Sequence, residues 1–495
     1  MRASIGFALS VLVAGCGNSG SNGGGGVDAS FDLTAAPPDL TMVMVDLAPS
    51  TIPGTRVLAG DVALDGVTTD DRAIVTDQKK GLLAVTISGG MAQPQVIDPA
   101  PDSVAIGGKV VFSFSTVDMT TGVGKLIVWS QAVGAPKVLS QAAVNGVVSA
   151  SADGLYIAYS DKASFDGATA DLIVAKADGS GAHTIATGVD SGAGGCQPFL
   201  QFAGGKLIFT HCDLAAAPDG GMASATVSFA DPATGNATVL KANAADTFSV
   251  DKAGAKVFVA DAMGKGSVVS TAGMPEVAID TNVSDGYITG DGSTVIYRTL
   301  GNALKRASVS AMPGPVVLVA KNVNQLQALS PDEKWVLFTN TTDNNTGFYD
   351  LFLSSATTPG APVTLVANPA GSLIGADPFT ADNSRAVFFG EVDANTLAGT
   401  LIAQPVSGGM MAMLGAKAWT EFAAKGTTVV FGDHYRAAAM QRGRVDVFVA
   451  DTAKTDPPAQ LVPNADADIF PNTAKDKLLF TISTGTGNGL YVLGL

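Results

Sequence analysis

The sequence is short of charge. Asp, Glu, Lys and Arg make up only 15% of its 495 residues, and there are only three histidines. The 29 basic residues are outnumbered by 44 acidic ones, which gives a net charge of −15 and excludes the basic surface of a nucleic-acid-binding protein. A mostly helical protein is also excluded, because its outer faces need charged side chains whereas this chain has few charges and 58 glycines. A hydrophobic content of 46% excludes a disordered chain.

Long apolar runs are also missing. No run of about 18 or more apolar residues follows Cys16, so the sequence predicts no membrane-spanning helix. One short apolar stretch, Ile5–Val13, follows Arg2 and leads into Val13-Ala14-Gly15-Cys16. This pattern resembles the signal of bacterial lipoproteins. The resemblance implies that residues 1–15 are a signal peptide removed in front of Cys16, and that the Cys16 thiol carries the lipid.

Residues 16–54 are predicted to be a tether. Gly17–Gly26 contains only Gly, Asn and Ser, a composition typical of a flexible coil. Two phrases rich in Pro and Asp-Leu follow, Phe31–Leu40 and Val45–Pro49, and they resemble the spacers of surface lipoproteins from Gram-negative soil bacteria. By resemblance to enterobacterial sorting, Gly17 rather than Asp after the lipidated Cys favours the outer membrane. We therefore expect a lipid-anchored envelope protein on the periplasmic face or the cell surface.

The rest of the chain repeats one phrase. An Asp- and Gly-rich turn precedes a short strand of β-branched and aromatic residues, most clearly at Ser151–Ser160 and Ser330–Thr339. Asp and Gly suit such turns because they tolerate a positive φ. Nine steps between ten matching apolar positions cover 404 residues, so the mean period is about 45 residues, as in four-stranded propeller blades. The ten positions are Ile74, Val110, Ile157, Ile208, Val257, Val295, Val336, Val387, Val429 and Leu478.

The two clear phrases resemble the repeat of TolB-like β-propellers, and Asp171–Ile185 matches the second and third strands of that repeat. The resemblance implies an all-β propeller over residues 55–495. The last phrase, at 473–495, has room for about two strands, and Thr55–Ala59 could supply a missing outer strand, as in propellers that close by pairing the two chain ends. We expect one ring of seven to ten four-stranded blades, with two smaller propellers as the alternative.

Two cysteines remain after Cys16. Cys196 and Cys212 are 16 positions apart in a chain predicted to be exported, which favours a disulfide between them. A zinc site built from these two with His211 and Asp213 is the alternative. It is disfavoured because adjacent residues on a strand point to opposite faces.

Few other residues suggest a site. His434, Tyr435 and Arg436 form a polar and aromatic phrase that we interpret as a loop between two strands and a candidate binding surface.

His183 is expected to be a solvated residue of an outer strand. Asp343–Asp350 is expected to be a polar turn, with a weak cation site as the alternative. Asp466 and Asp468 do not continue into a calcium loop, and Met410, Met411 and Met413 are expected to make apolar strand contacts.

The functional interpretation follows from these patterns. The sequence contains no Gly-x-Ser-x-Gly motif and no catalytic set that we recognise, so we interpret the chain as a binding or scaffolding module for a protein or glycan partner. It is expected to be monomeric and to need no cofactor or metal. The alternative is a propeller-type hydrolase or lyase that acts on extracellular polysaccharide with acidic residues in the central channel.

Overall fold

The computed structural model describes residues 52–88, 93–192, 198–212, 225–261, 263–310, 314–340, 350–366, 372–393, 395–438, 441–483, 485 and 487–495. Every regular element in these ranges is a β-strand. The same ranges contain no helix long and apolar enough to cross a membrane. Residues Pro53–Leu495 form one compact unit. The predicted signal peptide and Cys16 lie outside the described residues, as do the predicted tether up to residue 51 and Cys196.

The strands form antiparallel sheets, and in all but the last of them chain order is also spatial order. The first three blades are β2 (Val62–Val67), β3 (Arg72–Asp77), β4 (Gly81–Thr86), β5 (Gln95–Asp98); β6 (Ser103–Gly107), β7 (Val110–Ser115), β8 (Val123–Ser130), β9 (Lys137–Val144); and β10 (Val148–Ala150), β11 (Tyr156–Asp161), β12 (Thr169–Lys176), β13 (His183–Asp190). A seven-stranded sheet follows: β14 (Leu200–Ala203), β15 (Lys206–His211), β16 (Ala225–Ala230), β17 (Ala237–Val250), β18 (Lys256–Asp261), β19 (Gly266–Ser270) and β20 (Val277–Asp280).

The remaining sheets have four strands each. They are β21 (Val283–Ile288), β22 (Thr294–Thr299), β23 (Leu304–Ser308), β24 (Val316–Val319); β25 (Gln325–Leu329), β26 (Trp335–Asn340), β27 (Asp350–Ser355), β28 (Val363–Val366); β29 (Ser372–Leu373), β30 (Arg385–Gly390), β31 (Gly399–Pro405), β32 (Ala412–Ala418); β33 (Thr420–Ala423), β34 (Thr428–Ala438), β35 (Gln441–Asp451), β36 (Ala459–Asp466); and β37 (Ile469–Pro471), β38 (Lys477–Ile482), β39 (Gly489–Gly494), β1 (Thr55–Ala59).

The seven-stranded sheet is two blades that share one long strand. The first part of β17 pairs with β16, its last residues pair with β18, and the register shifts between Ala244 and Phe248. Strand β17 is therefore the outer strand of the fourth blade and the inner strand of the fifth. Counted in this way, the described residues form ten blades, which is the upper end of the predicted range. The all-β propeller predicted from the repeat is confirmed.

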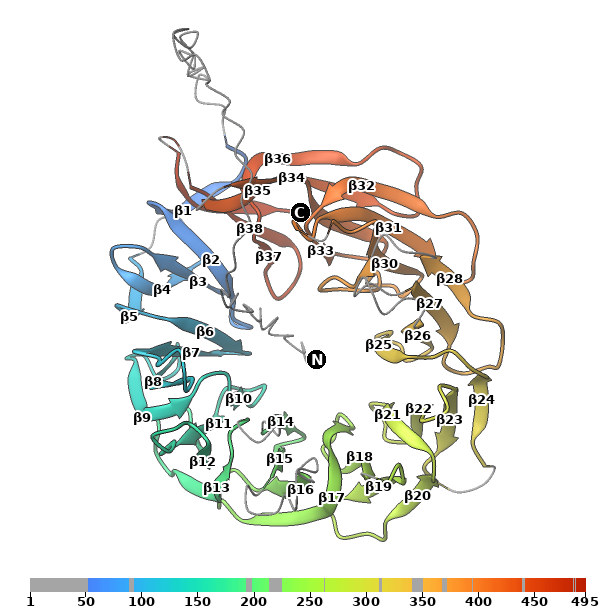
Figure 1. Cartoon of the computed structure of the whole chain (residues 1–495). Coiled ribbons are helices and arrows are strands. Elements are labelled where there is room, and N and C mark those ends of the chain that lie inside the picture. Colours follow the sequence, from blue (N-terminus) through green and yellow to red (C-terminus); the bar gives the residue numbers. More distant parts are fainter. Residues whose placement is uncertain are drawn as a thin grey trace, which may run out of the picture. The chain divides into compact units, whose positions relative to one another are not determined.

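Pairing of the two ends of the unit closes the ring (Figure 1). Strand β1 pairs antiparallel with β39, from Thr55 opposite Val492 to Ala59 opposite Gly489. The tenth blade therefore takes three strands from the C-terminus and its outer strand from residues 55–59, as the sequence predicted. In Figure 1 the first strand of a blade, such as β10 or β25, lies nearest the middle of the ring, and the fourth, such as β13 or β24, lies outermost.

The core lies between blades rather than within them. All six residues of β7 are buried, because the second strand of the blade has a neighbouring sheet against each face. Phe112 of the second blade packs in one cluster with Tyr159 of the third, and Leu337 of the seventh blade packs with Phe388 of the eighth. This arrangement explains why the second strand of each repeat is apolar on both faces.

Polar links join the blades next to this core. The carboxylate that ends the outer strand of one blade accepts a hydrogen bond from a hydroxyl on the second strand of the next. Asp98 accepts from Ser113 at 2.8 Å, and Asp466 accepts from Thr481 at 2.7 Å. Asp466, the last residue of β36, is fully buried. Its carboxylate therefore links two blades and does not belong to a calcium loop.

The turn between the first and second strands explains the Ser-x-Asp phrase. The hydroxyl of Ser151 donates to Asp153 at 2.6 Å and accepts from the Tyr156 backbone N–H at 2.9 Å. The positive φ falls on the residue after Asp, which is Gly154 here and Glu333 in the equivalent turn. Asp thus fixes the turn by hydrogen bonding, and the left-handed residue follows it. We call this end of the ring the turn end. The opposite end, where the second and third strands connect and the chain passes to the next blade, is the loop end.

The methionine cluster and His183 differ from the sequence-based expectations. Met410, Met411 and Met413 are exposed at the connection of β31 to β32 and along β32, so the expected apolar strand contacts are wrong. Gly408 and Gly409 take positive φ in this connection, and β32 is the edge strand of its own sheet. His183 begins β13, an outer strand as expected, but it is half-buried against the β16–β17 turn.

We predict that Gly489→Ala weakens the ring closure. Gly489 has φ +155°, and a Cβ there would lie 2.2 Å from the backbone oxygen of Leu58 on β1. The substitution should reduce the free energy of unfolding by about 2 kcal/mol or more, because backbone atoms must separate. Urea unfolding and hydrogen exchange of the β1 amides measure this.

Gly485→Ala is the matched control. Gly485 has φ +83°, but a Cβ there meets nothing within 4 Å. Gly485→Ala should therefore reduce the free energy of unfolding by only about 1 kcal/mol, which is the cost of placing Ala at a positive φ. Equal loss of β1 protection in the two variants would contradict a closure that depends on the β1–β39 contact.

Candidate functional site

The three residues predicted to form a binding loop lie instead within a strand. His434, Tyr435 and Arg436 belong to β34, which continues past Gly432 and pairs with β35 as far as Ala438. The loop prediction is wrong because the ladder extends beyond the apolar core of the strand. The register shifts between Asp433 and Arg436, and His434 has φ +54°. Such an irregularity re-aims side chains, and here it leaves His434 and Arg436 exposed.

Asp446 of β35 holds these side chains together. Its carboxylate lies 3.0 Å from Nδ1 of His434 and accepts a hydrogen bond of 3.0 Å from Nη2 of Arg436. The backbone N–H of Asn464 donates to the same carboxylate at 2.8 Å. Partial burial raises the pKa of Asp446, but the hydrogen bonds from Arg436, Asn464 and His434 outweigh it and lower the pKa to about 2. The carboxylate is therefore charged at any physiological pH.

An aromatic pair borders this network. The rings of Trp419 and Tyr435 stack with centroids 4.5 Å apart and an angle of 13° between planes. Tyr435 lies over Gly443 of β35, where a Cβ would come within 2.3 Å of the ring. Trp419 lies in the connection from β32 to β33 and donates its backbone N–H to Gly432 of β34 at 3.0 Å, so this connection and β34 supply the pair. We call Trp419, His434, Tyr435, Arg436, Asp446 and Asn464 the blade-9 surface.

The blade-9 surface combines two kinds of chemistry. Arg436 and His434 offer planar N–H groups whose orientation Asp446 fixes, and the aromatic pair offers a rigid apolar face with polar edges. Groups held in this way lose little conformational entropy when they bind a partner. Sequence reasoning found His434, Tyr435 and Arg436 but missed the rest, because only the β34–β35 register brings Asp446 and Gly443 beside them.

A second cluster lies at the inner strands. Glu421 of β33, Asp377 ahead of β30 and Lys475 ahead of β38 come from the ninth, eighth and tenth blades. Asp377 donates its backbone N–H to Glu421 at 3.1 Å and accepts one from the Ala423 backbone at 3.0 Å, and Lys475 forms an ion pair with Asp377. No motif pointed to this inner-strand cluster, because its members are far apart in sequence.

Glu421 is the unusual member of the inner-strand cluster. Only 2% of the residue is exposed, and its Oε2 has no hydrogen-bond partner among the described residues. Burial raises the pKa of Glu421 to about 8 and the charge of Asp377 adds to the rise, whereas the Asp377 N–H and Lys475 oppose it. Glu421 is therefore mostly protonated at neutral pH, which makes its burial tolerable.

We predict that Glu421 makes the ring less stable as pH rises. A pKa raised from 4.5 to about 8 on folding means that the folded state binds the proton more tightly. The stabilisation is complete below pH 4.5 and is lost as pH rises to about 8. Glu421→Gln should remove this slope, worth about 3 to 4 kcal/mol between pH 5 and pH 8 by urea unfolding.

Glu276→Gln is the control for this titration. Glu276 is a more exposed carboxylate paired with Lys241 at 2.7 Å, and its pKa is lowered chiefly by hydrogen bonding to that lysine. Its neutralisation should leave the slope between pH 5 and pH 8 unchanged. A wild-type slope that persists in Glu421→Gln would show that other groups cause it.

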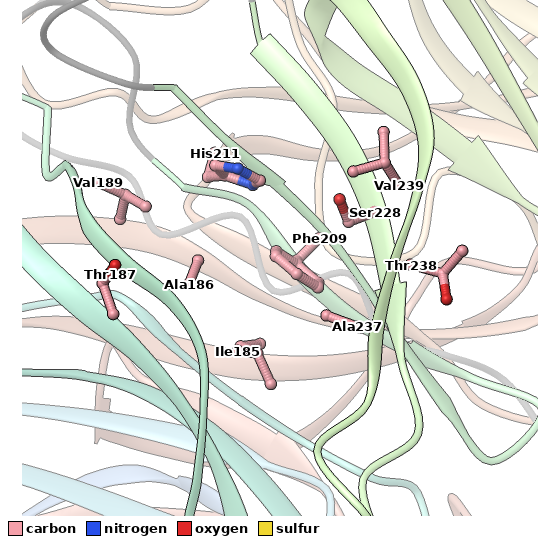
Figure 2. Close-up of a pocket in the computed structure, with 10 residues that line it drawn as sticks. All are labelled: Ile185, Ala186, Thr187, Val189, Phe209, His211, Ser228, Ala237, Thr238 and Val239. Carbon is pink, nitrogen blue, oxygen red and sulfur yellow. The ribbon is translucent and has the colours of Figure 1, made fainter.

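An open pocket of about 300 Å³ lies between the third and fourth blades (Figure 2). Figure 2 shows Phe209 and His211 of β15 between β13 residues on one side and β17 residues on the other. The rings of Phe209 and His211 stack at 5.7 Å. The lining combines apolar and polar residues: Ile185, Ala186, Thr187, Val189, Phe209, His211, Ser228, Ala237, Thr238 and Val239.

The predicted cysteine chemistry borders this pocket. Cys212, next to His211, is buried, whereas Cys196 and Asp213 lie outside the described residues. The Cys196–Cys212 disulfide therefore stays a prediction. Within the described ranges there is no group of three or more His, Cys, Asp or Glu side chains that could hold a metal ion. The expected polar turn at Asp343–Asp350 also lies outside these ranges, except for Asp350 at the start of β27.

No protein-family model and no curated protein matches the sequence. Solved structures are similar at low identity. Dipeptidyl peptidase 4 of Porphyromonas gingivalis is 11% identical with a TM-score of 0.45, over 84% of this chain and 60% of that one. A structure described as the eukaryotic initiation factor is 11% identical with a TM-score of 0.45, over 83% and 91% of the two chains. A putative TolB from Agrobacterium tumefaciens is 16% identical with a TM-score of 0.26, over 52% and 94%.

These similarities concern the fold alone. The chain spans less than two thirds of the Porphyromonas peptidase. The β-propeller assignment rests on the ten blades and their closure.

Proposed function

We propose that this chain is a lipid-anchored β-propeller of the bacterial cell envelope that binds a protein or glycan partner through the blade-9 surface. The observation that carries the proposal is the stacked Trp419–Tyr435 pair beside the exposed side chains of His434 and Arg436, all at the loop end. Trp, Tyr and Arg are the side chains most enriched where binding energy concentrates. The lipid anchor rests on the Val13–Cys16 motif and the tether that follows it.

A polysaccharide hydrolase or lyase is the rival proposal. Its acid would be Glu421, which holds a proton at neutral pH as a general acid must. Glu421 is only 2% exposed, however, and its carboxyl lies against Gly375, where a Cβ would come within 2.0 Å of it. A side chain enclosed in this way does not touch a substrate. The geometry therefore supports binding better than catalysis.

We predict that Trp419→Ala and Arg436→Ala each weaken partner binding by about tenfold, because they remove the aromatic face and the oriented guanidinium. A photo-crosslinking residue at position 434, in the full chain in its native envelope, measures this, with products stained for both protein and glycan. Lys334→Ala is the control, since Lys334 is exposed at the turn end, where its ammonium pairs with Asp332. Unchanged crosslinking in both test variants would overturn the proposal.

The anchor is tested separately. Cys16→Ala should release the protein from the membrane fraction, because the predicted lipid is attached to that thiol, and fractionation of the envelope measures it. A Cys16→Ala protein that still fractionates entirely with membranes would contradict the lipoprotein prediction.

A further inference from the structure

Four exposed apolar side chains lie in the same kind of loop in four blades. Met119, Phe165, Met263 and Leu300 lie in the loops that connect the second and third strands of the second, third, fifth and sixth blades. Their residues are 93%, 102%, 84% and 59% exposed, respectively. We call these four side chains the apolar tip row. Single exposed apolar residues are common, but here four second-to-third-strand loops at one end of the ring each carry one.

The four loops belong to one end of the ring. Antiparallel strands alternate in direction, so the second-to-third-strand loop of every blade leaves from the loop end. Contacts between neighbouring loops agree with this. A Cβ on Gly167 of the third blade would lie 2.6 Å from the backbone oxygen of Thr121 in the second. A Cβ on Gly264 of the fifth would lie 2.8 Å from Cδ1 of Leu300 in the sixth. The row therefore comprises two pairs of touching loops.

Hydrogen bonds hold two of the tips rigidly. Asp118 accepts the backbone N–H groups of Thr120 and Thr121 at 2.8 and 3.0 Å, which fixes the loop that carries Met119. Asp166 accepts the Ser164 hydroxyl at 2.6 Å and the Ala168 N–H at 3.0 Å, next to Phe165. These hydrogen bonds also lower the pKa of both carboxyls, so both are charged at neutral pH.

The charge beside the row selects the class of partner. The four loops and the strand ends that begin them carry Asp118, Asp161, Asp166 and Asp261 against Lys162 and Lys265, which is 4 − 2 or two net negative charges. Lys162 is itself paired with Asp171 at 3.3 Å. The whole chain carries −15. An anionic lipid surface would be repelled by this charge, whereas a protein surface with basic and apolar side chains would be attracted.

We propose that the apolar tip row docks a partner protein whose surface combines basic and apolar side chains. The proposal names the partner chemistry of the proposed binding function and rests on it. Binding buries the four tips, and the neighbouring aspartates steer the approach and set the orientation.

The test compares apolar residues at the two ends of the ring. Met119→Ser, Phe165→Ser, Met263→Ser and Leu300→Ser are combined in one full-length variant. Leu155→Ser with Met274→Ser is the matched control, because these residues are 60% and 68% exposed in turn-end connections. Phe165→Ser alone, at a fully exposed position, covers the case in which the fourfold variant fails to fold.

Two probes are used. The first is a fluorescent amphipathic helix of Leu and Lys, whose binding is followed by polarisation. We expect the fourfold variant to bind it about tenfold more weakly, the control to bind as wild type, and Asp118→Asn with Asp166→Asn to reduce the salt dependence. The second probe is vesicles of phosphatidylethanolamine and phosphatidylglycerol. It is used on variants that also carry Cys16→Ala, so that the predicted lipid anchor is absent, and none of them should bind. Equal loss in the fourfold variant and the control, or vesicle binding that the fourfold variant abolishes, would overturn the proposal.

A photo-crosslinking residue at position 165 or 155 extends the test to the envelope. A crosslinked partner protein from position 165 and none from position 155 would support docking by the apolar tip row. Equal crosslinking from both positions would overturn it. Products at 434 without products at 165 would leave the proposed function standing and remove this inference.

Discussion

The pairing of β1 with β39 is the contact on which the ring depends. A blade cannot bury both faces of its sheet unless it has a neighbour on each side, so an open row of ten blades would expose apolar surface at both ends. The pairing places the two ends of the unit in one sheet, and the core of that sheet then continues from Leu479 and Leu490 to Leu64 of the first blade. Residues 55–59 are thus few in number but necessary for every other interface.

Closure also explains the composition. Since each sheet packs against two others, the middle strands are apolar on both faces and the protein needs few charges. The charges that remain often have specific partners. Aspartates end outer strands and accept hydroxyl hydrogen bonds from the next blade, as Asp98 and Asp466 do, and others fix turns, as Asp153 does. The acidic balance is therefore largely a by-product of how the blades are connected.

Local patterns were enough to predict the repeat, the number of phrases and the closing strand, because turns and strand periodicity depend on residues that are close together in the sequence. The blade-9 surface was predictable only in part. Tyr435 and Arg436 stood out as polar and aromatic, but their strand and their partner Asp446 depend on a register shift that leaves no local signal. Glu421 could not be found at all, since its raised pKa arises from burial and from residues of two other blades.

The two ends of the ring are under different constraints, and this bears on function. At the turn end, Ser151 and Asp153 and their equivalents close tight turns whose geometry the hydroxyl and carboxylate dictate, so substitution there costs stability. At the loop end, the second-to-third-strand loops vary in length and composition from blade to blade without breaking the ladder. Side chains suited to binding can therefore be introduced at the loop end with little loss of folding stability. Both the blade-9 surface and the apolar tip row lie there.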